Sequence, residues 1–194
     1  MKTIELFTTP LFHCNIDSTR ELLPKLEEYA LHQEKYKSGR NVSNVNGGHQ
    51  TPFLSTSEEP LYHALVDKLK DEIKSVLRQW NFNDKLQATI GGCWIINRKG
   101  HLNMPHMHPE CDFAGIYYIK ADEKTPIGFL NPDVEVKHTH GEKYIEKNSW
   151  SSPHFMFFPK DNDFIMFPGH IEHWVDPHWA DTPRISLAFN IKIV

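Results

Sequence analysis

The second half of the chain, from Leu86 onward, is a succession of short runs of β-branched and aromatic residues separated by turn residues. These runs span residues 88–97, 113–119, 127–130, 155–158, 163–167, 172–175 and 184–194. Short strands that recur about every 8–12 residues are typical of a β-sandwich or a β-barrel. The pattern therefore predicts a closed or double-sheet β fold for this half.

The first 85 residues carry signals of a short strand region followed by two helices. Residues 3–16 alternate between apolar and polar side chains and predict two short strands around a turn. Capping-box signatures at residues 18–21 and 56–59 predict the starts of two helices. In the second helix, apolar residues recur every four positions from Leu61 to Leu77, which predicts a face that packs on a core. Residues 38–52 between the helices have the composition of a loop.

A chain of 194 residues is long enough to bury a sizeable core and is typical of one domain. We therefore predict a single domain over residues 1–194, mainly β with N-terminal helices. Residues 1–85 would supply the N-terminal strand and the helical support. Residues 86–194 would form a double-stranded β-helix (jelly-roll, cupin-like) barrel that the two helices buttress.

Composition and charge exclude several classes of partner. The net charge of −4 disfavours nucleic acid and anionic membrane surfaces as partners. No apolar run approaches the roughly 20 residues of a membrane span, and Glu5 interrupts what would be the apolar region of a signal peptide. The three cysteines are widely spaced and form no C-x-x-C motif. This usage predicts a reducing, cytoplasmic setting.

The most distinctive polar segment contains His106, His108 and Glu110 at alternating positions. In an extended strand, residues two apart project from the same face. A further histidine from a neighbouring strand could complete a facial set of ligands of the kind that non-haem Fe(II) oxygenases use. The alternative is a polar edge strand with scattered surface histidines, since the chain contains 13 of them.

Two later segments could complete such a site. His173 follows a strand end at Phe167-Pro168-Gly169, where a ligand near a pocket mouth is expected. Arg184 and Ser186 occupy same-face positions at the start of the last strand. A guanidinium inside a barrel needs an anion and suits a carboxylate bidentately, and the Ser186 hydroxyl could contact the same carboxylate. The alternative for Arg184 is an ordinary cation on an edge strand.

Several motifs, in their order and spacing, resemble one enzyme superfamily. They are Gly92–Asn97, Gly100, His106–Pro109, Ala114–Tyr118, Phe129–Asp133, Ile165–Pro168, His173–Val175, Arg184–Asn190 and the loop Ser43–Gln50. Together they resemble the 2-oxoglutarate/Fe(II)-dependent oxygenases, and within them a mostly uncharacterised branch of microbial and viral enzymes.

The resemblance implies a non-haem dioxygenase with Fe(II), 2-oxoglutarate and O2 as cofactor and cosubstrates. Its metal ligands would be His106, His108 and His173. The enzyme would hydroxylate an unidentified substrate while 2-oxoglutarate is decarboxylated to succinate. The wider superfamily has an acidic residue where His108 stands, so Glu110 is an alternative third ligand in a shifted register.

The resemblance also implies the cofactor-binding residues. The distal carboxylate of 2-oxoglutarate would meet Arg184 and Ser186, and Tyr117 and Asn97 are further candidates. A cupin-like metal-binding protein that does not use 2-oxoglutarate is the main alternative, and it gives Arg184 no role. A structural zinc site is less favoured, because it prefers four N/S ligands and no cysteine is suitably spaced.

The polar stretch from Val134 to Pro153, with help from Ser43–Gln50, is expected to form a lid over the metal. Tyr144 and Trp150 in this stretch are candidate substrate-binding aromatics, although a solvated hairpin is an equal alternative. The expected substrate is a small molecule or a protein side chain. The oligomeric state is open, and a homodimer is compatible with the sequence. The remaining histidines, including His178, are expected at the surface or around the ligands.

Overall fold

The structure is a computed structural model that describes residues 2–3, 8–54, 59–83, 85–132 and 152–194. Its helices are the 3-10 helix η1 (Asp17–Leu22), α1 (Leu23–Tyr36) and α2 (Pro60–Gln79). Its strands are β1 (Phe12–Asn15), β2 (Asn44–Val45), β3 (His49–Gln50), β4 (Ala88–Asn97), β5 (Leu102–His106), β6 (Phe113–Lys120), β7 (Ile127–Leu130), β8 (His154–Phe157), β9 (Asp163–Pro168), β10 (His173–Val175) and β11 (Arg184–Ile193). The described helices include none that is long and apolar enough to cross a membrane.

The strands form two antiparallel sheets. The six-stranded sheet has the order β1-β9-β6-β11-β4-β3, and the five-stranded sheet has the order β2-β5-β10-β7-β8. From β4 onward the chain crosses repeatedly between the two sheets, as in a jelly roll wound from antiparallel strands. The prediction of a mainly β, double-stranded β-helix fold with N-terminal helices is confirmed.

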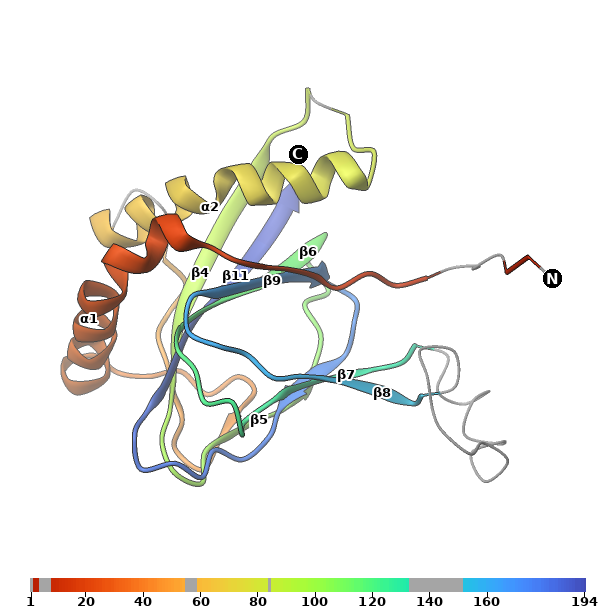
Figure 1. Cartoon of the computed structure of the whole chain (residues 1–194). Helices are drawn as coiled ribbons and strands as arrows, with labels where there is room; N and C mark the ends of the chain where they lie inside the picture. The colour runs from red at the N-terminus through yellow and green to blue at the C-terminus, as the bar shows by residue number, and fades with distance from the viewer. Residues whose placement is uncertain (1, 4–7, 55–58, 84, 133–151) are drawn as a thin grey trace.

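Both helices cover the outer face of the six-stranded sheet, on the side away from the five-stranded sheet (Figure 1). The predicted apolar stripe of α2 is confirmed, because Leu65, Leu69 and Ile73 are buried in this outer core. Alternate residues of the strands, such as Trp94 and Leu187, complete it. The helices therefore close one face of the sheet and leave the other face for the space between the sheets.

A second apolar cluster lies between the sheets. It contains Ile116 and Tyr118 from β6, Ile127 and Phe129 from β7, and Phe167 from β9. These residues are offset by one position from those of the outer core, as the period of two in a strand requires. This inner cluster fills only part of the interior, and the rest is a pocket.

Two local expectations from the sequence are wrong. Ser18 does not cap a helix, because the 3-10 helix η1 begins one residue earlier and Ile16 precedes it without a side-chain cap.

Residues 38–52 are not all loop. Their strands β2 and β3 pair with β5 and β4, so this segment extends both sheets. Of the second capping box, only Glu59 lies within the described residues, and its side chain accepts a hydrogen bond from the Leu61 amide at the start of α2.

Candidate metal centre and pocket

Three histidines converge at the open end of the barrel. His106 ends β5 and lies opposite His173 of β10 in the antiparallel register, while His108 follows the end of β5. One ring nitrogen from each of the three lies within 4.8 Å of the others. Glu110 lies in the exposed turn beyond His108 and is not a member of this cluster, so the geometry favours the register with His106.

Each imidazole is oriented by a hydrogen bond from its Nδ1 atom. The acceptors are the Met104 carbonyl for His106 at 2.8 Å, the Ile171 carbonyl for His173 at 2.9 Å, and Asn190 Oδ1 for His108 at 2.6 Å. A carbonyl oxygen cannot donate, so Nδ1 carries the proton and Nε2 keeps its lone pair. This arrangement is how proteins fix the tautomer of a metal-binding histidine.

Burial also keeps the three imidazoles neutral. Desolvation lowers the pKa of His106, of His108 and of His173, and the pKa of His173 falls to about 3. The neighbouring imidazoles lower the pKa of His173 further. Since a neutral imidazole is the form that binds a metal, the cluster is ready for a divalent ion at neutral pH.

Arg184 lies in the same pocket, at the first residue of β11. Its side chain is 1% exposed, and its Nε and Nη2 atoms find no hydrogen-bond partner among the described residues. Its guanidinium carbon lies 5.1 Å from the ring centre of Tyr118. Arg184 and Ser186 line a cavity of about 250 Å³ together with the three histidines. An uncompensated buried cation is costly, and a carboxylate in the cavity would satisfy it.

The backbone just before Arg184 is held by His178. This side chain is completely buried, and its Nε2 atom lies 2.6 Å from the Thr182 carbonyl oxygen. Its Nδ1 atom lies 3.1 Å from Thr125 Oγ1 and 3.3 Å from Asp122 Oδ2. His178 is thus a buried support of the connection into β11 rather than a surface residue.

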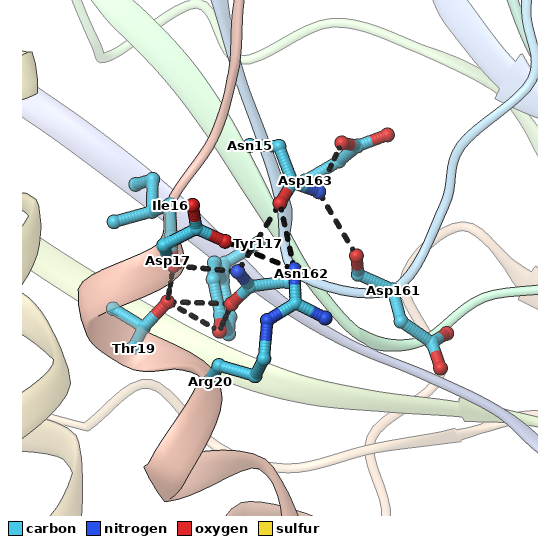
Figure 2. Close-up of polar contacts among 9 residues, drawn as sticks. All are labelled: Asn15, Ile16, Asp17, Thr19, Arg20, Tyr117, Asp161, Asn162 and Asp163. Atoms are coloured by element: carbon cyan, nitrogen blue, oxygen red, sulfur yellow. Dashed lines mark hydrogen bonds and ion pairs between the residues drawn. The ribbon is translucent and has the colours of Figure 1, made fainter.

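Tyr117 does not lie in the pocket, and its prediction as a cofactor-binding residue is wrong. Its side chain projects from the outer face of β6, where its hydroxyl lies 2.9 Å from Thr19 Oγ1 and 2.6 Å from Asn162 Oδ1 (Figure 2). The next residue, Tyr118, projects to the inner face beside Arg184. The resemblance gave the correct strand, and the alternation of side chains decides which tyrosine faces the cavity.

Asn97 also differs from its predicted role, because it stands behind the cavity wall. Its Nδ2 atom donates a hydrogen bond to Asn103 Oδ1 at 3.0 Å, and Asn103 is the residue that lines the cavity. Sequence reasoning missed Asn190 and Gln50, which also line it. Asn190 could have been found by counting in steps of two from Arg184 along β11, whereas Gln50 was included only in the loop Ser43–Gln50 and was given no role of its own.

The predicted lid and its aromatics, Tyr144 and Trp150, lie outside the described residues. The segment Ser43–Gln50, expected to assist the lid, is instead paired to both sheets. Asn103 Nδ2 donates to Ser43 Oγ at 3.2 Å, and most of the segment is buried. It is therefore a fixed wall of the pocket.

Comparison with known proteins identifies the kind of site. A sequence profile described as "Putative 2OG-Fe(II) oxygenase" matches residues 92–190, about half of the chain. No protein among those with curated functions matches the sequence.

Solved structures share the fold. A prolyl-4-hydroxylase from Pseudomonas putida has a TM-score of 0.67 and 11% identity, with coverage of 95% of this chain and 93% of that chain. HygX from Streptomyces hygroscopicus, with nickel and 2-oxoglutarate bound, has a TM-score of 0.65 and 11% identity, over 95% and 83%. A viral collagen prolyl hydroxylase from Paramecium Bursaria Chlorella virus-1, in complex with 2OG, has a TM-score of 0.59 and 14% identity, over 93% and 94%.

At these identities the structures establish the fold, while the profile establishes the family, so the resemblance seen in the motifs is confirmed. The histidine cluster and the buried Arg184 fit the iron and the cosubstrate that the family's name specifies. The chain belongs to the 2OG-Fe(II) oxygenases and is an oxidoreductase that uses Fe(II), 2-oxoglutarate and O2.

Proposed function

We propose that this enzyme hydroxylates a small molecule or a protein side chain, with decarboxylation of 2-oxoglutarate to succinate. The observation that carries the proposal is that the three histidines line one cavity with Arg184, whose Nε and Nη2 atoms have no hydrogen-bond partner among the described residues. We further propose that residues 86–194 are the catalytic core and residues 1–85 its support within one domain. The homodimer and the cytoplasmic location stay predictions from the sequence.

The residues of the cavity divide the work between its two ends. His106, His108 and His173 would hold the iron through their Nε2 atoms. Arg184 and Ser186 would bind the distal carboxylate of 2-oxoglutarate and so direct its keto-acid end toward the histidines. Iron with 2-oxoglutarate activates dioxygen for oxidation of a substrate C–H bond.

The apolar residues that line the cavity favour binding of the 2-oxoglutarate carboxylate to Arg184. Ile116, Ile127, Phe167 and Val175 line the cavity and make much of its wall apolar. In such surroundings the attraction between a guanidinium and a carboxylate is stronger than in water. An ion pair between Arg184 and the cosubstrate would therefore stabilise binding more in this cavity than on the protein surface.

The test is formation of succinate by the purified protein with Fe(II), 2-oxoglutarate and O2. Slow turnover without a primary substrate is expected, and it should depend on both iron and oxygen. Isothermal titration of 2-oxoglutarate into the anaerobic Fe(II) protein supplies an independent binding readout. Iron binding without 2-oxoglutarate binding or turnover would refute the proposal and favour the cupin-like alternative.

A further inference from the structure

Gln50 brings an unused hydrogen-bond acceptor to the pocket. It lies on β3, opposite Ile95 of β4, and its side chain lines the cavity while being only 6% exposed. Its Nε2 atom donates to Cys93 Sγ at 3.4 Å, but its Oε1 atom is buried without a partner among the described residues. Burial of an acceptor without a donor is unfavourable, so a ligand that supplies the donor would be bound selectively.

The backbone of Gln50 is held in place by its neighbours, and its side chain by the contact with Cys93. The Gln50 carbonyl accepts a hydrogen bond from the Arg40 amide at 2.7 Å, and the Thr51 amide donates to the Trp94 carbonyl at 3.0 Å. Burial raises the pKa of the Cys93 thiol to about 12, so the group beside the Gln50 amide is a neutral thiol. A group fixed in this way loses little conformational freedom when a ligand binds.

The cosubstrate cannot supply the missing donor. A carboxylate offers only acceptors, so it suits the guanidinium of Arg184 and is repelled by the Gln50 amide oxygen. Apart from water, the molecule in the cavity that can supply the donor is the primary substrate.

The volume of the cavity and the residues at its mouth indicate the size and the polarity of the rest of the substrate. A volume of about 250 Å³ lies below the roughly 300–1,000 Å³ typical of pockets that enclose a whole drug-sized ligand. Shared with 2-oxoglutarate, it has room for only one small group of the substrate. Val42, Phe53 and Met107 also line the cavity and are 60%, 42% and 52% exposed, which gives the mouth an apolar rim.

We propose that Gln50 is a specificity-determining residue whose Oε1 atom accepts a hydrogen bond from an N–H or O–H donor beside the reacting carbon. The substrate presents this donor-bearing group from a larger body whose apolar part lies on the rim. This inference rests on the proposed function, because it assumes that Arg184 engages 2-oxoglutarate.

The test compares two probes that differ in one donor. N-methylacetamide carries an N–H group, and N,N-dimethylacetamide carries a methyl group in its place. Binding is measured from the paramagnetic relaxation of probe protons in the Mn(II)-loaded protein with 2-oxoglutarate, which does not require turnover. In the unmodified protein, N-methylacetamide should bind about 2- to 10-fold more tightly than its partner, as one neutral hydrogen bond provides.

Variants at position 50 test whether the preference for N-methylacetamide depends on the Gln50 Oε1 atom. Gln50→Met, which keeps the length but removes the acceptor, should abolish the preference, whereas Gln50→Glu, which keeps an acceptor oxygen, should retain it. Gln79→Met, the same change at an exposed helix end, should behave as the unmodified protein.

The outcomes distinguish failure of the inference about Gln50 from failure of the proposed function. If 2-oxoglutarate fails to bind the unmodified protein, the proposed function itself fails. If 2-oxoglutarate binds but the two probes bind alike, or the preference survives in Gln50→Met, the inference about Gln50 is overturned. It is also overturned if Gln50→Met loses 2-oxoglutarate affinity, because Gln50 would then contact the cosubstrate.

Discussion

The two faces of the six-stranded sheet are built from alternating residues of the same strands, yet their polar groups are paired differently. On the outer face, the Tyr117 hydroxyl lies within hydrogen-bond distance of Thr19 and Asn162, which tie η1 and the turn before β9 to β6 (Figure 2). On the inner face, Arg184 and Gln50 are as deeply buried but have polar atoms without described partners. A buried group that is fully paired stabilises the fold, whereas an unpaired group that lines a cavity indicates a site for a ligand. Trp94 Nε1 in the outer core also has no partner among the described residues, but Trp94 does not line the cavity.

The largest expected effect is loss of the metal from the inner face. His173→Ala removes one of the three proposed ligands, so we expect the variant to lose stoichiometric Fe(II) binding while remaining folded. Metal content after anaerobic loading and desalting measures this. His63→Ala, at an exposed position of α2, is the matched control and should keep its iron. Stoichiometric iron in His173→Ala would show that the ligand set is wrong.

The same measurement decides between the two registers of the ligand segment. His106→Ala should lose iron as His173→Ala does, while Glu110→Ala should keep it, because Glu110 lies outside the cluster. The opposite result would make Glu110 the ligand and would mean that the chain around Pro109 rearranges when the metal binds.

The next effect concerns Arg184, where binding and stability should change in opposite directions. Arg184→Met should weaken 2-oxoglutarate binding about 10- to 150-fold, because a charge-assisted contact is lost. Without ligands, the same variant should be more stable by about 1–4 kcal/mol, since a buried uncompensated cation is replaced by an apolar side chain. Isothermal titration and urea unfolding measure the two effects.

The control for this prediction is Arg98→Met. Arg98 lies on the surface in a two-pronged contact with Glu34, at 2.7 and 2.8 Å, outside the cavity. Its replacement should leave 2-oxoglutarate affinity unchanged and should not stabilise the protein. If the Arg184→Met variant binds 2-oxoglutarate with normal affinity, the guanidinium does not contact the cosubstrate.

A smaller effect is expected at Gly169, which supports the metal centre from the turn after β9. The His108 amide donates to the Gly169 carbonyl at 2.8 Å, and a Cβ atom on Gly169 would lie 2.8 Å from the His108 carbonyl oxygen. Gly169→Ala should therefore displace His108 and weaken iron binding about 10- to 100-fold, as loss of a supporting contact does. Gly100→Ala is the control: a Cβ atom there meets no atom within 4 Å, and although its φ of +84° makes alanine strained and lowers stability, iron affinity should be unchanged. Equal iron affinity in the two variants would contradict this account.

The smallest effect on ligand binding is expected on the outer face. Tyr117→Phe should reduce the free energy of unfolding by about 1–3 kcal/mol, because buried partners lose their hydrogen bond. Iron and 2-oxoglutarate affinities should stay unchanged, which equilibrium unfolding and titration can show together. Tyr36→Phe, at an exposed position, should alter neither. Weakened 2-oxoglutarate binding in Tyr117→Phe would show that Tyr117 contributes to cosubstrate binding, contrary to its position in the structure.

The sequence predicted the fold and the three histidines that the structure brings together, because strand alternation is a local property. His106 and His108 are two residues apart, so their common face follows from the period of a strand, and the strand end at Phe167–Gly169 marked His173. Tyr117 was assigned to the wrong face because motif resemblance gives the strand but not the direction of each side chain. Gln50 was predicted only as the end of the loop Ser43–Gln50, because its place in the cavity wall depends on the pairing of a two-residue strand across the sheet.

The account rests on iron and 2-oxoglutarate occupying opposite ends of the inner-face cavity. A crystal structure of the anaerobic protein with Fe(II) and 2-oxoglutarate, with anomalous data at the iron edge, tests this directly. We predict one iron bound to the Nε2 atoms of His106, His108 and His173, and the distal carboxylate of 2-oxoglutarate against Arg184. Iron bound through Glu110, or a guanidinium that remains without a carboxylate, would contradict the account.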